Sequence, residues 1–211
     1  MRALLALLAL MLLGAAAPSA KPSFSCSGRV SPTEAAICAD PELAAWDRAI
    51  AKVYRLTDRS DPGLAARQSA WLSKRNRCGA KRTCVLAAYR TWQGFTEPVS
   101  GVGLSLHRKG TDPSDPADLE VMQVYGSWFY FSIQALSIRD AEAGNVHDGS
   151  IAGIVELRAG KAKFDESPDD PYACRFRITR SALHYWTIDE EEAQSTCAGQ
   201  GVYFSGEYRS S

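Results

Sequence analysis

Six cysteines constrain the fold of this 211-residue chain more than any other feature. They are Cys26, Cys38, Cys78, Cys84, Cys174 and Cys197. In an oxidising compartment an even set of cysteines forms disulfides, and small domains depend on them because their cores bury little apolar surface. We therefore expect three disulfides, one of them between Cys174 and Cys197, with no thiol left for nucleophilic chemistry.

The segment before the first cysteine predicts that compartment. Arg2 supplies a positive charge, an apolar run follows from Ala3 to Leu13, and small residues lead to Ser19 and Ala20. This order is typical of a secretory signal peptide, and the run is shorter than the ~20 apolar residues that span a bilayer. We expect residues 1–20 to be removed and the mature chain to be periplasmic or secreted, with no stable membrane span.

The charge balance argues against two classes of partner. The chain has 24 Lys and Arg residues and 24 Asp and Glu residues, and removal of Arg2 leaves 23 against 24. Nonspecific binding to nucleic acid or to an anionic membrane requires an excess of positive charge. We therefore expect no nucleic-acid partner.

Composition divides the mature chain into two modules. Residues 22–95 carry apolar side chains at helical spacing, whereas residues 119–211 alternate apolar and polar side chains. Residues 96–118 are rich in Pro and Gly, and within this linker residues 102–107 are a candidate first strand. The predicted fold class is α+β: an N-terminal disulfide-braced helical hairpin of three helices, then a C-terminal antiparallel β barrel or sandwich.

Capping residues place the helices and gather the cysteines. Ser31 and Asp40 each precede a proline, so the first helix is expected as a short turn followed by a longer helix. Short connections make the first two long helices antiparallel, which brings the four N-terminal cysteines to one end. Three pairings of these four remain open. A bond between Cys78 and Cys84 is the least favoured, because it would leave the N-terminal segment loose.

The β module is dominated by one alternating segment, residues 127–138. Its large inward-facing side chains are expected on one face: Phe129, Phe131, Ile133 and Ala135. About six short strands separated by turn residues predict an antiparallel meander, closed by a last strand at 202–208.

The first module resembles the N-terminal domain of the LprI-like lysozyme inhibitor family over residues 24–93. The resemblance lies in four cysteines and a Gln-x2-Trp-x3-Arg-x2-Cys motif in one order. Besides the cysteines it is carried by Phe24, Glu34, Leu43, Asp47, Tyr54, Gln68, Trp71, Arg75 and Tyr89. The second module is similar to the small β domain that sometimes follows. The resemblance implies a secreted, non-enzymatic protein that inhibits lysozyme.

The motif contains three polar residues with two interpretations. Asp47, Gln68 and Arg75 are either a functional polar cluster or a buried ion pair that sets helix register beside Trp71. Buried ion pairs specify an arrangement more than they stabilise it, and we favour the structural interpretation.

Catalytic and metal chemistry find little support in the sequence. His107, His147 and His184 lack metal-ligand spacing, and the acidic residues at 112, 115 and 118 do not match a calcium loop. Hydrolase signatures are also missing, such as a Gly-x-Ser-x-Gly elbow or paired carboxylates in apolar segments. We expect no catalytic residues, no metal and no cofactor, and a hydrolase is the least favoured class.

Two segments of the β module are candidate partner-binding sites. The first is the acidic run Asp189, Glu190, Glu191 and Glu192, which would steer a basic partner such as animal lysozyme, or would be a solvated hairpin tip. The second is Ser205, Gly206 and Tyr208, which resemble Ser-Gly and Tyr elements of other periplasmic lysozyme inhibitors, or would belong to the final strand.

Together these patterns predict a secreted periplasmic binding protein without enzymatic activity, with lysozyme as the candidate target. The alternative is an interaction module for another cell-envelope protein.

Overall fold

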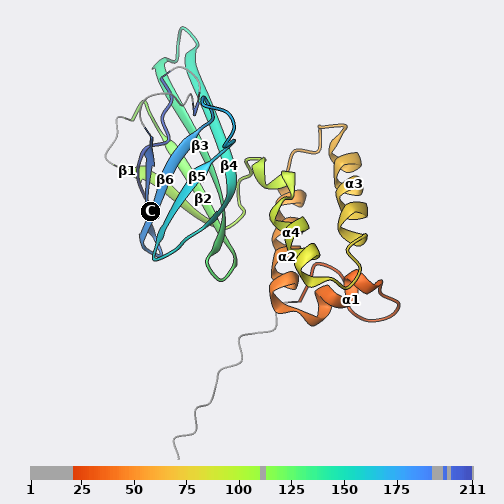
Figure 1. Cartoon of the computed structure of the whole chain (residues 1–211). Coiled ribbons are helices and arrows are strands. Elements are labelled where there is room, and N and C mark those ends of the chain that lie inside the picture. Colours follow the sequence, from red (N-terminus) through yellow and green to blue (C-terminus); the bar gives the residue numbers. More distant parts are fainter. Residues whose placement is uncertain (1–20, 110–112, 192–196, 199–200, 211) are drawn as a thin grey trace, which may run out of the picture.

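The computed structural model describes residues 21–109, 113–191, 197–198 and 201–210. The expected signal peptide and Glu192 lie outside these residues. The described chain is α+β, with a helical module that packs on one side of an antiparallel barrel (Figure 1).

The helical module contains four α-helices, not three. They are α1 (Pro32–Ala39), α2 (Pro41–Leu56), α3 (Leu64–Asn76) and α4 (Arg82–Arg90), followed by the 3-10 turn η1 (Gln93–Thr96). The expected short turn before Pro41 is a full helix, because Ser31 and Glu34 close a capping box at its start. Asp40 then caps α2 by accepting from the backbone amides of Glu42 and Leu43.

The three disulfides join Cys26 to Cys38, Cys78 to Cys84, and Cys174 to Cys197. The last bond confirms the prediction. The preference against pairing Cys78 with Cys84 is wrong, because the N-terminal segment is fastened in other ways. Its own Cys26 is bonded to α1, and Ser23 donates to Asp47 on α2.

Among the described residues, eight strands form one antiparallel sheet that is nearly closed into a barrel. They are β1 (Leu104–Lys109), β2 (Ala117–Tyr125), β3 (Trp128–Asp140), β4 (Asn145–Glu156), β5 (Lys161–Asp165), β6 (Arg175–Ala182), β7 (Tyr185–Glu190) and β8 (Gly206–Arg209). Their hydrogen-bonded order is β4-β3-β2-β1-β8-β7-β6-β5, so β1 pairs with both β2 and β8. The candidate first strand in the expected linker is therefore β1, shifted by two residues.

The inner face of the barrel carries the first apolar core. The predicted inward set Phe129, Phe131, Ile133 and Ala135 is buried there. Phe131 also contacts Phe164 and Phe176, with ring centroids 5.0 and 5.5 Å away. Gly153 on β4 permits this packing, because a Cβ at that position would lie 2.4 Å from the Phe164 ring. Phe164 of β5 thereby packs against β4. These two strands are the first and the last in the hydrogen-bonded order.

The second apolar core is shared by the two modules. Trp46 of α2 is fully buried, with its ring centroid 5.7 Å from Trp128 of β3 and 6.1 Å from Phe95 of η1. Phe95 in turn lies 5.8 Å from Tyr130, whose hydroxyl donates to the Glu97 carbonyl at 2.6 Å. The helices therefore cover the outer face of β2, β3 and β4.

The expected linker is part of this shared core. Val99 and Val102 are buried in it, and the Val99 amide donates to the Ser132 hydroxyl at 3.1 Å. Residues 99–102 therefore fix the helices to the sheet instead of separating them.

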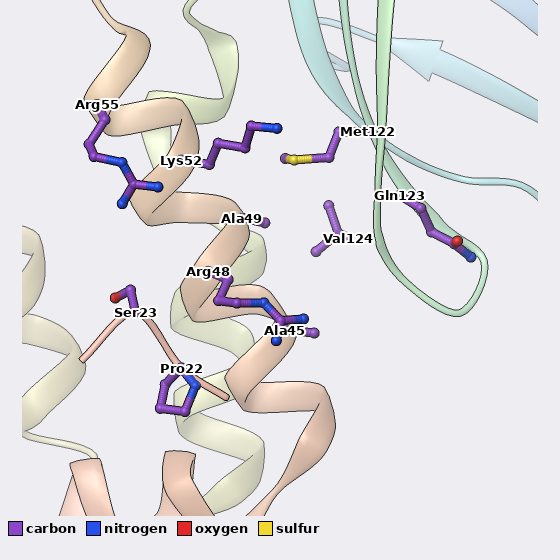
Figure 2. A pocket seen from close by; sticks show the side chains of 10 residues that line it. All are labelled: Pro22, Ser23, Ala45, Arg48, Ala49, Lys52, Arg55, Met122, Gln123 and Val124. Atoms are coloured by element: carbon purple, nitrogen blue, oxygen red, sulfur yellow. The ribbon is translucent and has the colours of Figure 1, made fainter. Parts of the chain in front are cut away.

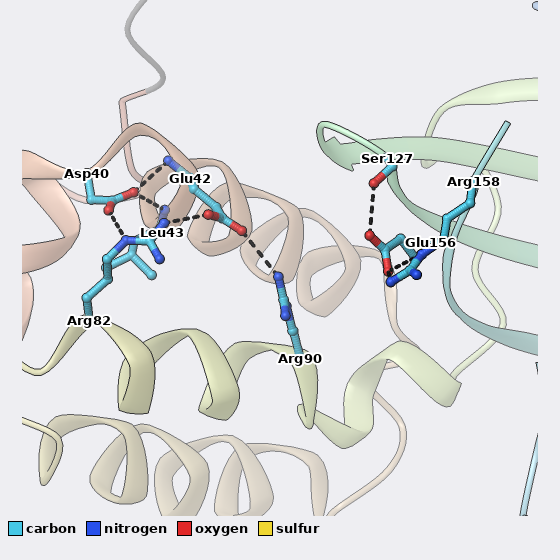
Figure 3. Close-up of polar contacts among 8 residues, drawn as sticks. All are labelled: Asp40, Glu42, Leu43, Arg82, Arg90, Ser127, Glu156 and Arg158. Atoms are coloured by element: carbon cyan, nitrogen blue, oxygen red, sulfur yellow. Dashed lines mark hydrogen bonds and ion pairs between the residues drawn. The ribbon is translucent and has the colours of Figure 1, made fainter. Parts of the chain in front are cut away.

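Ion pairs join α4 to the start of α2 (Figure 3). Arg82 of α4 donates to Asp40 and Glu42, both at 2.5 Å, and Arg90 donates to Glu42 at 3.4 Å. The Arg90 guanidinium also lies 4.5 Å from the Trp128 ring centroid, in a cation–π contact across the two modules.

None of the described helices is both long and apolar enough to cross a membrane.

The shared core predicts that helices and barrel unfold together. Trp46→Ala should lower the free energy of unfolding by about 3–5 kcal/mol, because it leaves a cavity between the modules. Circular dichroism of the helices and tryptophan fluorescence should then follow one transition in denaturant. Tyr172→Ala, which removes a side chain that is 68% exposed, is the control and should change stability by less than about 0.5 kcal/mol. Two separate transitions, with only one shifted by Trp46→Ala, would contradict a shared core.

Candidate functional site

Asp47 is the centre of a buried polar cluster in the helical module. Its carboxylate accepts from the Ser23 amide at 2.7 Å, the Ser23 hydroxyl at 2.5 Å, and Arg75 and Tyr89 at 3.2 Å each. These donors come from the N-terminal segment, α3 and α4, while Asp47 belongs to α2. One carboxylate therefore joins four parts of the module.

The ion pair at the centre of the cluster is buried, while Ser23 at its edge is exposed. Asp47 and Arg75 are each 5% exposed, and the Arg75 guanidinium also donates to the Asn76 side chain. Burial, and then the Asp47 charge, raise the pKa of Tyr89, so its hydroxyl stays a hydrogen-bond donor. This enclosure favours the structural interpretation of the ion pair.

Gln68 lies apart from the Asp47 cluster. Its side-chain oxygen accepts from the indole nitrogen of Trp92 at 2.9 Å, and Trp71 donates to the Ala88 carbonyl at 3.0 Å. Gln68 and Trp71 line a separate pocket of about 340 Å³ between α3 and η1. The three polar motif residues therefore do not form one cluster.

The remaining motif residues have local roles. Glu34 closes the capping box of α1, and Tyr54 is half-buried with the Arg59 guanidinium 4.7 Å from its ring centroid. The Ser31 amide, and then the Ser31 hydroxyl, lower the pKa of Glu34.

The acidic run is largely engaged within the barrel. Glu190 accepts from the amides of Phe204 and Ser205 at 3.0 and 2.9 Å, which fastens the segment before β8 to β7. Glu191 lies 3.1 Å from the Lys163 ammonium group. Asp189 is exposed, in register with Arg177 of β6.

Gly206 and Tyr208 belong to β8, and Ser205 directly precedes it. The Ser205 hydroxyl donates to Glu190, and Tyr208 is fully buried with its hydroxyl on the Phe204 carbonyl. Gly206 has φ of +148°, and a Cβ there would lie 2.6 Å from the Arg108 side chain. The hypothesis that Tyr208 contacts a partner is corrected by this burial.

A projecting hairpin is the most prominent surface feature of the barrel (Figure 1). Strands β3 and β4 pair from Trp128 and Glu156 out to Asp140 and Asn145, and we call residues 136–149 the β3–β4 arm. The turn at its tip is held by Asp140, which accepts from the Ala143 amide at 2.9 Å.

Two other segments brace the base of the arm. The amides of Leu136 and Ile138 donate to the carbonyls of Pro116 and Ser114 at 2.9 and 2.7 Å. On the β4 side Gly149 lies so close to Ala198 that a Cβ would come within 2.4 Å of the Ala198 methyl group. Sequence analysis missed the arm because residues 145–150 are mostly polar. Gly144, a typical turn residue, was the sequence signal that could have revealed the hairpin.

A basic groove lies between α2 and β2, at the seam of the two modules (Figure 2). It has a volume of about 390 Å³. Its cationic side chains are Arg48, Lys52 and Arg55 of α2, and its apolar ones include Ala45, Ala49, Met122 and Val124. The spacing of the three cations by four and three residues along one helix was a signal that sequence analysis did not use.

The described part of the chain contains no evident metal site. There, no group of three or more His, Cys, Asp and Glu side chains is arranged to hold a metal ion.

The chain matches no protein-family model, no curated protein and no solved structure. The resemblance to the LprI-like family therefore rests on the motif residues named above.

Asp47→Asn tests the central role of the buried carboxylate. The change leaves the Arg75 charge buried without its partner, so the free energy of unfolding should fall by about 3–5 kcal/mol. Tyr89→Phe removes one hydrogen bond from the same carboxylate and should cost only about 0.5–1.5 kcal/mol. Urea denaturation measures both. Equal costs for the two variants would show that the ion pair does not hold the cluster together.

Glu34 predicts a pH dependence of stability. Its pKa is lower in the folded chain than the ordinary value of 4.5, so ionised Glu34 stabilises the fold above that value. This contribution is lost as the pH falls through the folded pKa. The stability difference between the wild type and Glu34→Gln, measured by urea denaturation, should therefore be present at pH 7 and shrink as the pH falls below the ordinary value of 4.5. A difference that is constant from pH 7 to pH 3 would contradict the prediction.

Proposed function

We propose that the mature chain is an exported, non-enzymatic binding protein that docks through the β3–β4 arm, with lysozyme as its target. The observation that carries the proposal is the arm itself, a braced hairpin that projects from the barrel. An inhibitor of this kind fills the cleft of an enzyme and needs no chemistry of its own.

Rigidity supports the proposal. The arm is held at its base by residues 114–116 and by Ala198, and the Cys174–Cys197 disulfide fastens the segment of Ala198 to the residue directly before β6. A projection that is ordered before binding loses little conformational entropy on docking. The three disulfides are also compatible with a protein that works outside the cytoplasm.

Charge supports the choice of a basic target. Glu142 near the tip and Asp148 on β4 are exposed, and neither has an ion-pair partner among the described residues. The β5–β6 connection at the same end of the barrel adds exposed Asp169 and Asp170. Such a surface attracts a basic protein and speeds its association.

A lysis assay with a basic animal lysozyme and residues 21–211 tests the proposal. The full mature chain is required, because helices and barrel share a core and isolated modules would lose it. We expect dose-dependent inhibition at micromolar concentration. Glu142→Lys combined with Asp148→Lys should weaken inhibition by about tenfold or more, because two attractive charges become repulsive.

The matched control is Asp58→Lys combined with Glu207→Lys, which changes the net charge equally at exposed positions outside the arm. It should inhibit like the wild type. No inhibition by the folded wild type would overturn lysozyme as the target and favour the alternative, an interaction module for another envelope protein. Equal loss in both double variants would show that net charge, and not the arm, determines inhibition.

A further inference from the structure

The groove between α2 and β2 gathers three cations of one helix around a single pocket. Several other cations of this module contact carboxylates: Arg82 and Arg90 contact Glu42, Arg67 contacts Asp61, and Arg75 contacts Asp47. Others, such as Lys74 and Lys81, have no ion-pair partner among the described residues but line no groove with an apolar floor. The three cations of the groove have no carboxylate within ion-pair distance among the described residues. No acidic residue lines the groove.

Some of the side chains that line the groove lie in the space between α2 and β2 (Figure 2). Arg48 and Lys52 extend from α2 toward β2, and the Lys52 ammonium group approaches Met122. The Arg48 guanidinium also donates to the Lys21 carbonyl at 3.0 Å, which keeps it over the groove. Arg55 adds its charge from the other side of the helix.

The floor of the groove is apolar. Ala45, Ala49 and Val124 are buried beneath the cations, and Met122 is half-buried beside them. Alanine at positions 45 and 49 keeps α2 thin at this place, so the space between helix and strand stays open. Methionine adapts its shape to different apolar groups.

We propose that this groove binds an anionic amphiphile, with a phosphate or carboxylate head on Arg48 and Lys52 and a short apolar chain on the alanine and valine floor. Unpaired cations supply charge-assisted hydrogen bonds to the head. The apolar floor supplies the burial that a free inorganic anion lacks. The volume of about 390 Å³ lies within the ~300–1,000 Å³ range of small-molecule sites.

The proposed site is independent of the arm. The groove lies beside Met122–Val124, at the β2–β3 end of the barrel, whereas the arm projects from the β3–β4 end. In antiparallel strands joined in sequence, these two connections are at opposite ends. Loss of one activity therefore does not imply loss of the other.

Isothermal titration calorimetry with octyl phosphate, below the concentration at which it forms micelles, tests the site. Inorganic phosphate and octyl glucoside are the comparison probes, one with the head alone and one with the chain alone. Octyl phosphate should bind at least about tenfold more tightly than either, and its affinity should fall as salt is added. Equal affinity for inorganic phosphate would overturn the amphiphile. Equal affinity for octyl glucoside would overturn the role of the cations.

Variants locate the binding. Arg48→Gln combined with Lys52→Gln should weaken octyl phosphate binding by about tenfold or more, because both charges on the head are removed. Lys74→Gln combined with Lys81→Gln removes two exposed charges elsewhere in the helical module and should leave binding unchanged. Circular dichroism confirms that each variant is folded. Binding that survives in the groove variant, or is lost equally in the control, overturns the proposed site.

Discussion

The contact of Trp46 with Trp128 and Phe95 is the interaction on which the rest of the structure depends. It sets α2 against the outer face of the sheet, so the barrel has one core inside and a second outside. The next residue of α2, Asp47, lies about 100° further around the helix, where it holds α3, α4 and the N-terminal segment. One helix thus connects every part of the helical module to the sheet.

Local signals in the sequence predicted the local structure well. Prolines after Ser31 and Asp40 placed two helix starts, and alternation placed the inward face of β3. The shared core was not predictable in this way. It unites Trp46 with residues some eighty positions later, and alternation alone does not say that the outer face of β3 is covered. The same lack of long-range information made the linker look like a spacer.

Of the candidate sites, the sequence predicted the enclosed pair of Asp47 and Arg75 but not the exposed surfaces. A buried ion pair can be recognised in the sequence as a motif, because both partners must occupy fixed positions on the inner faces of their helices. The groove and the arm depend on how α2 meets β2, and on how far β3 and β4 extend together. For Tyr208 the alternative interpretation holds: its side chain is buried in the final strand and is not on a partner-binding surface.

The disulfides are formed between successive cysteines along the chain: first with second, third with fourth, fifth with sixth. A polypeptide exported N-terminus first would present its thiols to an oxidase in that same order. Each cysteine would meet its native partner as the next thiol to emerge. Oxidation in order of emergence therefore gives the native bonds directly, without a disulfide isomerase to exchange wrong pairs.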